Sequence, residues 1–204
     1  GPICGIGNVQ EPIPKVISGL SQRLGVPNTE ISVRLVAQHA FEYHVFSEFP
    51  SKDLPPFLLH AEVNGDDVTD LALKELFKPF PFKFDLFFNR VTASAAIQAF
   101  KGFLAKEPTA MHLPGVNGLI GGYPVVLKDG LAELDLHKEW TEADAIDTNV
   151  RSLPWEGIEC IESDGSITFT EVTQSAFKTL LGKSVQGVTL DTSMDQAHQL
   201  LKAL

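Results

Sequence analysis

Cysteine is scarce in this chain of 204 residues, which contains only Cys4 and Cys160. The two lie far apart and outside any Cys-x-x-Cys pattern, so the sequence offers neither a disulfide framework nor a zinc ribbon. This usage favours a reducing compartment, and we expect a cytoplasmic protein. The apolar setting of Cys4 predicts a buried, inert thiol rather than a nucleophile.

Long apolar runs and basic runs are also lacking. No stretch approaches the roughly 18 apolar residues of a membrane span, and the start of the chain does not have the pattern of a signal peptide. Lys and Arg number 16 against 26 Asp and Glu, which gives a formal net charge of -10. Because an acidic surface repels phosphate groups, we expect neither nucleic acid nor membranes as partners.

Local signatures of nucleotide and hydrolase sites are missing as well. The sequence has no P-loop, no HExxH, no EF-hand loop and no GxSxG elbow. Gly5, Gly7 and the glycines of 115–122 have neither the spacing nor the following helix of a dinucleotide-binding GxGxxG segment. We therefore expect no nucleotide site within this chain.

Hydrophobic residues make up 44% of the sequence, and they recur with helix or strand spacing in many segments. Apolar spacing predicts helices at 9–24, 67–77, 92–105, 141–153, 171–181 and 193–204, and strands at 31–46, 57–63, 123–127, 132–136, 158–162, 166–170 and 188–190. This irregular order predicts an α+β fold with a mixed or antiparallel sheet and packed helices. We expect a main domain at 1–150 and a small ββαβα appendage at 151–204, which could be continuous with it.

The six histidines are scattered, and none forms an i, i+4 pair typical of a helical metal site. His39 falls on the apolar face of the predicted strand 31–46, which fits either a buried core histidine or a ligand or catalytic group. His137, next to Lys138 and Glu139, is typical of a surface residue.

Two further segments have two interpretations each. The glycine-dense run 115–122 could let backbone approach a ligand closely, or could be a tight connection between a helix and a hairpin. The phenylalanines of 80–88 could form a surface that docks a protein partner or a second copy of the chain, or could be core covered by a loop.

Four segments carry a family resemblance through their shared order. They are Gly7-Asn8-Val9-Gln10 with a helix ending Leu24-Gly25, Val36-Ala37-Gln38-His39-Ala40, the turn at 61–69, and an Ala-rich helix before Glu107-Pro108 followed by Asn117-Gly118-Leu119-Ile120 and a Val-rich hairpin. Residues 3–136 resemble the C-terminal domain of family 4 glycoside hydrolases, which belong to the lactate/malate dehydrogenase superfamily.

The resemblance implies an N-terminal Rossmann domain outside this chain, with NAD as its cofactor. It places His39 at a metal-binding histidine and Asn8 at an asparagine that faces substrate or cofactor. Gln10 stands where the ligand cysteine of the family would fall. Glutamine is a poor ligand for a Mn-type ion, so we expect no metal there.

The leading hypothesis is a substrate-binding or oligomerising domain of an NAD(P)-dependent, dehydrogenase-like protein, inactive alone. We expect a small-molecule substrate, with His39 as the acid or base and the amides of Asn8, Gln10, Gln38 and Asn117 as substrate contacts. The alternatives are a non-enzymatic interaction or dimerisation domain, and a divergent NAD- and metal-dependent glycosidase. An enzyme of the opine dehydrogenase type fits the sequence equally well.

Overall fold

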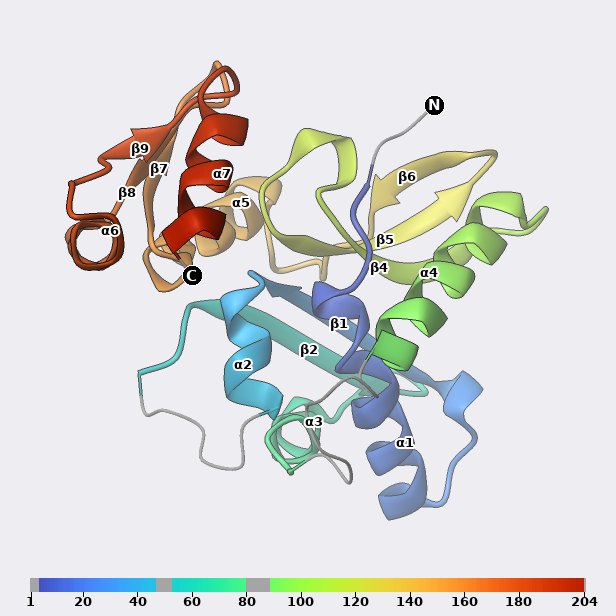
Figure 1. The fold of residues 1–204 in the computed structure, drawn as a ribbon. Coiled ribbons are helices and arrows are strands. Elements are labelled where there is room, and N and C mark those ends of the chain that lie inside the picture. Colours follow the sequence, from blue (N-terminus) through green and yellow to red (C-terminus); the bar gives the residue numbers. More distant parts are fainter. Residues whose placement is uncertain (1–3, 47–52, 80–88, 204) are drawn as a thin grey trace. The chain divides into compact units, whose positions relative to one another are not determined.

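The structure is a computed structural model that describes residues 4–46, 53–79 and 89–203 (Figure 1). The chain divides into two compact units, with the boundary between Ser152 and Leu153. The fold class is α+β, as predicted, and every strand pairing in the described residues is antiparallel.

The first unit combines helices with a six-stranded sheet of order β3-β2-β1-β5-β4, in which β6 also pairs with β5. Its elements are η1 (Asn8–Gln10), α1 (Ile13–Leu24), η2 (Asn28–Glu30), β1 (Ile31–Ala37), α2 (Ala40–Phe46), β2 (Phe57–Val63), β3 (Asp66–Asp67), α3 (Thr69–Leu76), α4 (Asn89–Leu104), β4 (Thr109–Pro114), η4 (Val116–Gly118), β5 (Gly122–Lys128), β6 (Leu131–Leu134) and α5 (Glu142–Arg151).

Two apolar clusters form the core of this unit. One joins η1, α1, α2 and α3 to one face of β1 and β2. Figure 1 shows α1, α2 and α3 beside those strands. The other joins β4, β5 and β6 to α4 and α5. Alternate residues of β1 point to opposite faces, so Val33 and Leu35 enter the first cluster while Val36 enters the second.

The predicted strand 31–46 is wrong in its second half. Strand β1 ends at Ala37, and residues 40–46 form α2. Phe41, Tyr43 and Val45 suggested a strand because they alternate, but Phe41 and Val45 are also four residues apart and share one face of a helix. Both are buried in the structure, whereas Tyr43 is 58% exposed.

Other sequence predictions need smaller corrections. The first helix begins at Ile13 rather than Val9. Pro12 and Pro14 lie at its start, and Gly25 is its C-cap. Strand β4 was not predicted. In α4 Ala95 and Ala99 are buried, whereas Phe100 is 68% exposed. The predicted phenylalanine surface at 80–88 lies outside the described residues.

The second unit is a three-stranded sheet of order β7-β8-β9 with two helices. Its elements are η5 (Leu153–Glu156), β7 (Ile158–Ile161), β8 (Ile167–Phe169), α6 (Glu171–Leu181), β9 (Gly187–Val188) and α7 (Ser193–Ala203). The side chain of Thr170 accepts a hydrogen bond from the N–H of Thr173 and so caps α6. Leu153 is the one buried hydrophobic residue among the described residues of this unit.

Both cysteines are without a disulfide. Partial burial raises the pKa of the Cys4 thiol, which keeps the thiol protonated and unreactive. Within 4–46, 53–79 and 89–203, no helix combines the length and apolarity needed to cross a bilayer.

Candidate functional site at the end of strand β1

The short helix η1 is held against the end of β1 by close packing with β5. Val9 is 1% exposed, and a Cβ atom added at Gly122 would lie 2.3 Å from Cγ2 of Val9. Gly122 in turn pairs with Ala37, the last residue of β1. Only glycine at position 122 allows this approach, which brings Asn8–Gln10 next to the residues that follow β1.

Gln38 and His39 form the junction between β1 and α2. The N–H groups of Phe41 and Glu42 donate to the carbonyls of Gln38 and His39 at 3.0 and 2.9 Å, which starts the helix. The buried Gln38 side chain accepts a hydrogen bond from the His39 N–H at 3.0 Å. Gln38 was predicted to contact substrate, but in the structure its amide oxygen holds this turn.

The His39 imidazole is accessible rather than buried on a strand face. Its side chain is 51% exposed, and its Nε2 lies 3.9 Å from Oε2 of Glu42, whose side chain is 10% exposed. The Tyr43 ring packs edge-on against it, with ring centroids 5.4 Å apart. The interpretation of His39 as a buried core histidine is therefore wrong, because the chain leaves the sheet before this residue.

Glu11 is a second ionisable group of this site, and sequence reasoning missed it. The residue is 5% exposed and accepts a hydrogen bond from Oγ1 of Thr92 in α4 at 2.5 Å. Burial raises the pKa of its carboxyl group, while the Thr92 hydrogen bond and the charge of His39 oppose that rise. A charged residue inside the apolar, proline-rich stretch 9–14 was the available signal.

The predicted amides differ in their placement. Asn8 adopts a left-handed conformation with φ 54°, and its buried Oδ1 has no hydrogen-bond partner among the described residues. Gln10 accepts a hydrogen bond from the Gly7 N–H at 2.8 Å. Asn117 belongs instead to η4, where its Nδ2 donates to the carbonyl of Ala132 at 3.1 Å. That bond fixes the loop 115–122 to β6, which favours the structural interpretation of the glycine run.

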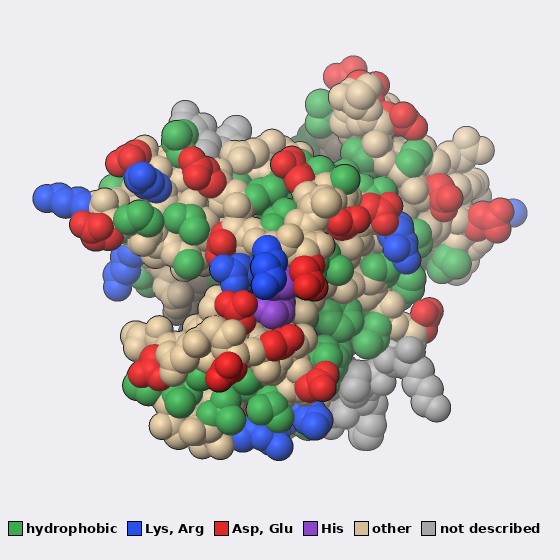
Figure 2. Space-filling view, turned by 180° about the vertical axis from the view of Figure 1, so that it is seen from behind, with side chains coloured by type: hydrophobic (Ala, Val, Ile, Leu, Met, Phe, Trp, Pro, Cys, Tyr) green, Lys and Arg blue, Asp and Glu red, His purple; other side chains and the backbone are tan. Residues whose placement is uncertain are grey.

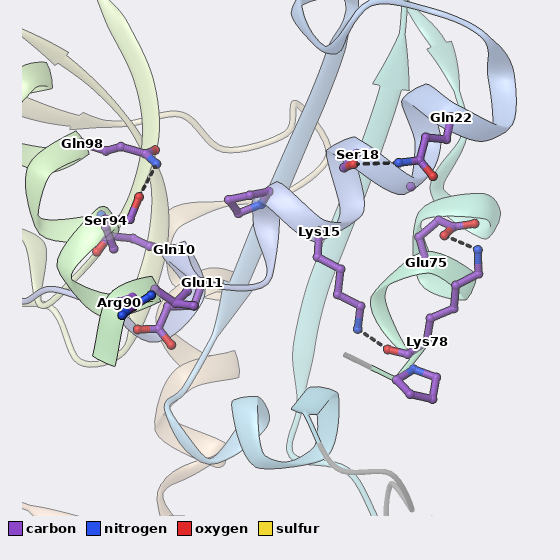
Figure 3. A pocket seen from close by; sticks show the side chains of 15 residues that line it. Gln10, Glu11, Lys15, Ser18, Gln22, Glu75, Lys78, Arg90, Ser94 and Gln98 are labelled. Carbon is purple, nitrogen blue, oxygen red and sulfur yellow. Dashed lines mark hydrogen bonds and ion pairs between the residues drawn. The ribbon is translucent and has the colours of Figure 1, made fainter. Parts of the chain in front are cut away.

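A cavity of about 650 Å³ opens beside Glu11, between η1, α1, α4 and the end of α3. Figure 3 shows Gln10, Glu11 and Arg90 on one side of it and Lys15 on the other. Lys15 donates to the carbonyl of Leu76 at 2.8 Å, and burial lowers its pKa to about 8 despite the opposing charge of Glu75. The volume suits a small molecule, and the wall offers cations, carboxylates and amides together.

A second polar cluster lies on the opposite face of β1 and β2. His137 was predicted to lie on the surface, and this prediction is wrong: the residue is 9% exposed. Its ring stacks on that of His60 with centroids 3.7 Å apart. Glu62 completes this cluster at 2.9 Å from His60. The sequence signal was His60-x-Glu62, because alternate residues of a strand share a face.

The chain matches no protein-family model, and a search among curated proteins gives no match either.

Proposed function

We propose that the first unit is the substrate-binding domain of an NAD(P)-dependent, dehydrogenase-like protein, with its site at the end of β1. The observation that carries the proposal is the accessible His39 imidazole set beside two nearly buried carboxylates, Glu11 and Glu42. A histidine in such surroundings can exchange a proton with a bound hydroxyl or carbonyl group.

The chemistry assigned to this chain is binding and proton transfer. The imidazole of His39 acts as acid or base, while Glu11 and Glu42 stabilise its protonated form electrostatically. Asn8 supplies a buried carbonyl oxygen that a ligand hydroxyl could satisfy. The cofactor assignment rests on the family resemblance, which implies that NAD is held by an N-terminal Rossmann domain outside this chain.

The neighbouring cavity suggests the substrate class; Gln10 and Glu11 line it, whereas His39 and Asn8 do not. Arg90 and Lys15 favour a carboxylate or another anionic group, while Gln10 and Glu11 offer partners for hydroxyls. We therefore infer a small, polar hydroxy or keto acid in the cytoplasm. Gln10 supplies no thiolate, so the proposal includes no metal-assisted step at this site.

The test compares NAD binding by this chain and by its full-length protein. We expect no binding by residues 1–204 alone and saturable binding by the full-length protein. His39→Gln should reduce kcat for the NAD-dependent turnover of a hydroxy or keto acid by about 100-fold or more, which is the usual contribution of a general acid or base. The affinity for NAD should be unchanged. His44→Gln, five residues further along, is the matched control and should retain activity. A full-length protein that does not bind NAD would remove the oxidoreductase proposal.

A protein-interaction domain is the second candidate, and helix α4 favours it. Ile97, Phe100 and Leu104 are 55%, 68% and 83% exposed, and their spacing of three and four residues places them on one stripe. Such a stripe is typical of a helix that docks on another surface. If it joins two copies, Phe100→Ser should convert a dimer into a monomer in light scattering with an unchanged circular dichroism spectrum. A wild-type monomer would contradict the dimer.

A further inference from the structure

The second polar cluster has the composition of a metal site. His60, Glu62 and His137 each offer one ligand atom, and the three atoms lie within 4.8 Å of one another. Zinc ligands at about 2.1 Å in a tetrahedral site are separated by about 3.4 Å. The His60 and His137 rings are stacked at an interplanar angle of 28°, so binding requires the rings to turn until one nitrogen of each points at the same ion.

The His60 imidazole is oriented by its other nitrogen. Its Nδ1 lies 3.3 Å from Oγ1 of Thr69, and that oxygen also accepts the Ala61 N–H at 3.1 Å. Its Nε2 lies 2.9 Å from Oε1 of Glu62. Histidines that bind metals are commonly oriented by a hydrogen bond at the ring nitrogen that does not face the ion.

Arg34 connects the two parts of the cluster. One guanidinium nitrogen lies 3.7 Å from Oε2 of Glu62, and Nε donates to the carbonyl of Asp135 at 3.0 Å. The same side chain therefore holds the strand that carries His60 and the segment that carries His137. Because Arg34 contacts Oε2, the other carboxylate oxygen of Glu62, Oε1, is left to face the histidines.

The charge around the cluster favours a cation. Glu62 belongs to the cluster, Asp67 interacts electrostatically with both histidines, and Arg34 forms ion pairs with Glu62 and Asp135. The three carboxylates together carry more charge than the single guanidinium. Figure 2 shows the face of the molecule where histidine side chains lie between basic and acidic ones. The charge of an ion held there would be largely neutralised by these groups.

We propose that His60, Glu62 and His137 bind one divalent transition-metal ion, with Zn²⁺ the best match. Two imidazoles and one carboxylate are the donor set of three-ligand zinc sites, which leave a fourth position for water. With the ring proton of the neutral His60 imidazole on Nδ1, toward Thr69 Oγ1, Nε2 is available to the ion beside Oε1 of Glu62. The ion joins β2 to the segment after β6 and is separate from the site at His39.

The experiment titrates Zn²⁺ by calorimetry into the chain of 204 residues after treatment with a chelator. We expect one equivalent to bind with a dissociation constant below about 1 µM and to raise the melting temperature. Co²⁺ should give visible absorption bands of a four-coordinate complex.

Variants distinguish this site from others. Glu62→Gln and His137→Gln should each weaken Zn²⁺ binding by about 100-fold, as expected when one of three ligands is lost, while circular dichroism shows that the fold persists. The exposed His198→Gln and the distant His39→Gln should bind as the wild type does. The proposal would be overturned if the wild-type chain bound no Zn²⁺ at about 100 µM, a concentration well above the expected dissociation constant. Unchanged binding by Glu62→Gln and His137→Gln, or loss of binding in His39→Gln, would also overturn it.

Discussion

His112 shows how a single ionisable side chain can stabilise this fold in its neutral form. The residue lies in β4 and its Nε2 accepts a hydrogen bond from the Leu35 N–H of β1 at 3.0 Å. Burial, with a smaller contribution from the charge of Arg34, lowers its pKa from 6.5 to about 3. The imidazole therefore serves as a neutral acceptor for a buried backbone donor, a role that the scattered histidines of the sequence did not reveal.

The pH dependence of stability follows from that pKa. As the pH falls below about 6.5, the unfolded chain takes up a proton at His112, whereas the folded chain does so only near pH 3. The stabilisation is fully present above pH 6.5 and is lost as the pH falls toward 3, at about 1.4 kcal/mol per pKa unit.

We expect His112→Leu to be less stable than the wild type at pH 7 by about 1–3 kcal/mol, because the Leu35 N–H loses its acceptor. The wild type alone loses about 1.4 kcal/mol per pH unit below about 6.5, since the variant has no imidazole to protonate, so the difference should shrink and then change sign toward pH 4. Urea unfolding at four pH values would measure both free energies, with the exposed His198→Leu as control. A difference that is independent of pH would contradict the assignment.

At the scale of elements, the sequence predicted most helices and strands but misassigned the end of β1, which carries the candidate site. Regular periodicity over 12 residues identified α1, and apolar segments on either side of Asp129-Gly130 identified the hairpin of β5 and β6. Residues 40–46 satisfy both a strand and a helix pattern, so only tertiary packing could decide between them. The partners of His39 and of His137 come from distant segments, and local spacing carries no information about them.

We expect the packing of η1 against β5 to depend on glycine at position 122. Gly122→Ala would place a methyl group against the buried Val9 side chain, and overpacking of this kind costs about 1–3 kcal/mol. The variant should also displace Asn8 and Gln10 and so reduce ligand binding at the proposed site.

A double-mutant cycle with Val9→Ala checks the mechanism. If the clash is with Val9, shortening that side chain should relieve it, and the double variant should be more stable than the sum of the two single effects predicts. Urea unfolding of the four proteins gives the coupling free energy. Strict additivity would show that Gly122 is required for another reason.

At the scale of the whole molecule, the two units differ in how much apolar surface they bury. The first unit holds two clusters of fully buried side chains. The second has strands of two to four residues and helices α6 and α7 without a buried residue. Chains this short bury too little surface to offset easily the conformational entropy lost on folding.

We therefore expect residues 1–152 alone to unfold in one cooperative urea transition with native-like circular dichroism. The fragment 153–204 should show a weak, broad transition with little fixed near-ultraviolet signal from Trp155, because a small core gives a small free energy and a small denaturant slope. The intact chain provides the reference for both. A steep transition in 153–204 would mean that its partly buried residues, such as Phe169 and Phe177 with ring centroids 5.2 Å apart, suffice as a core.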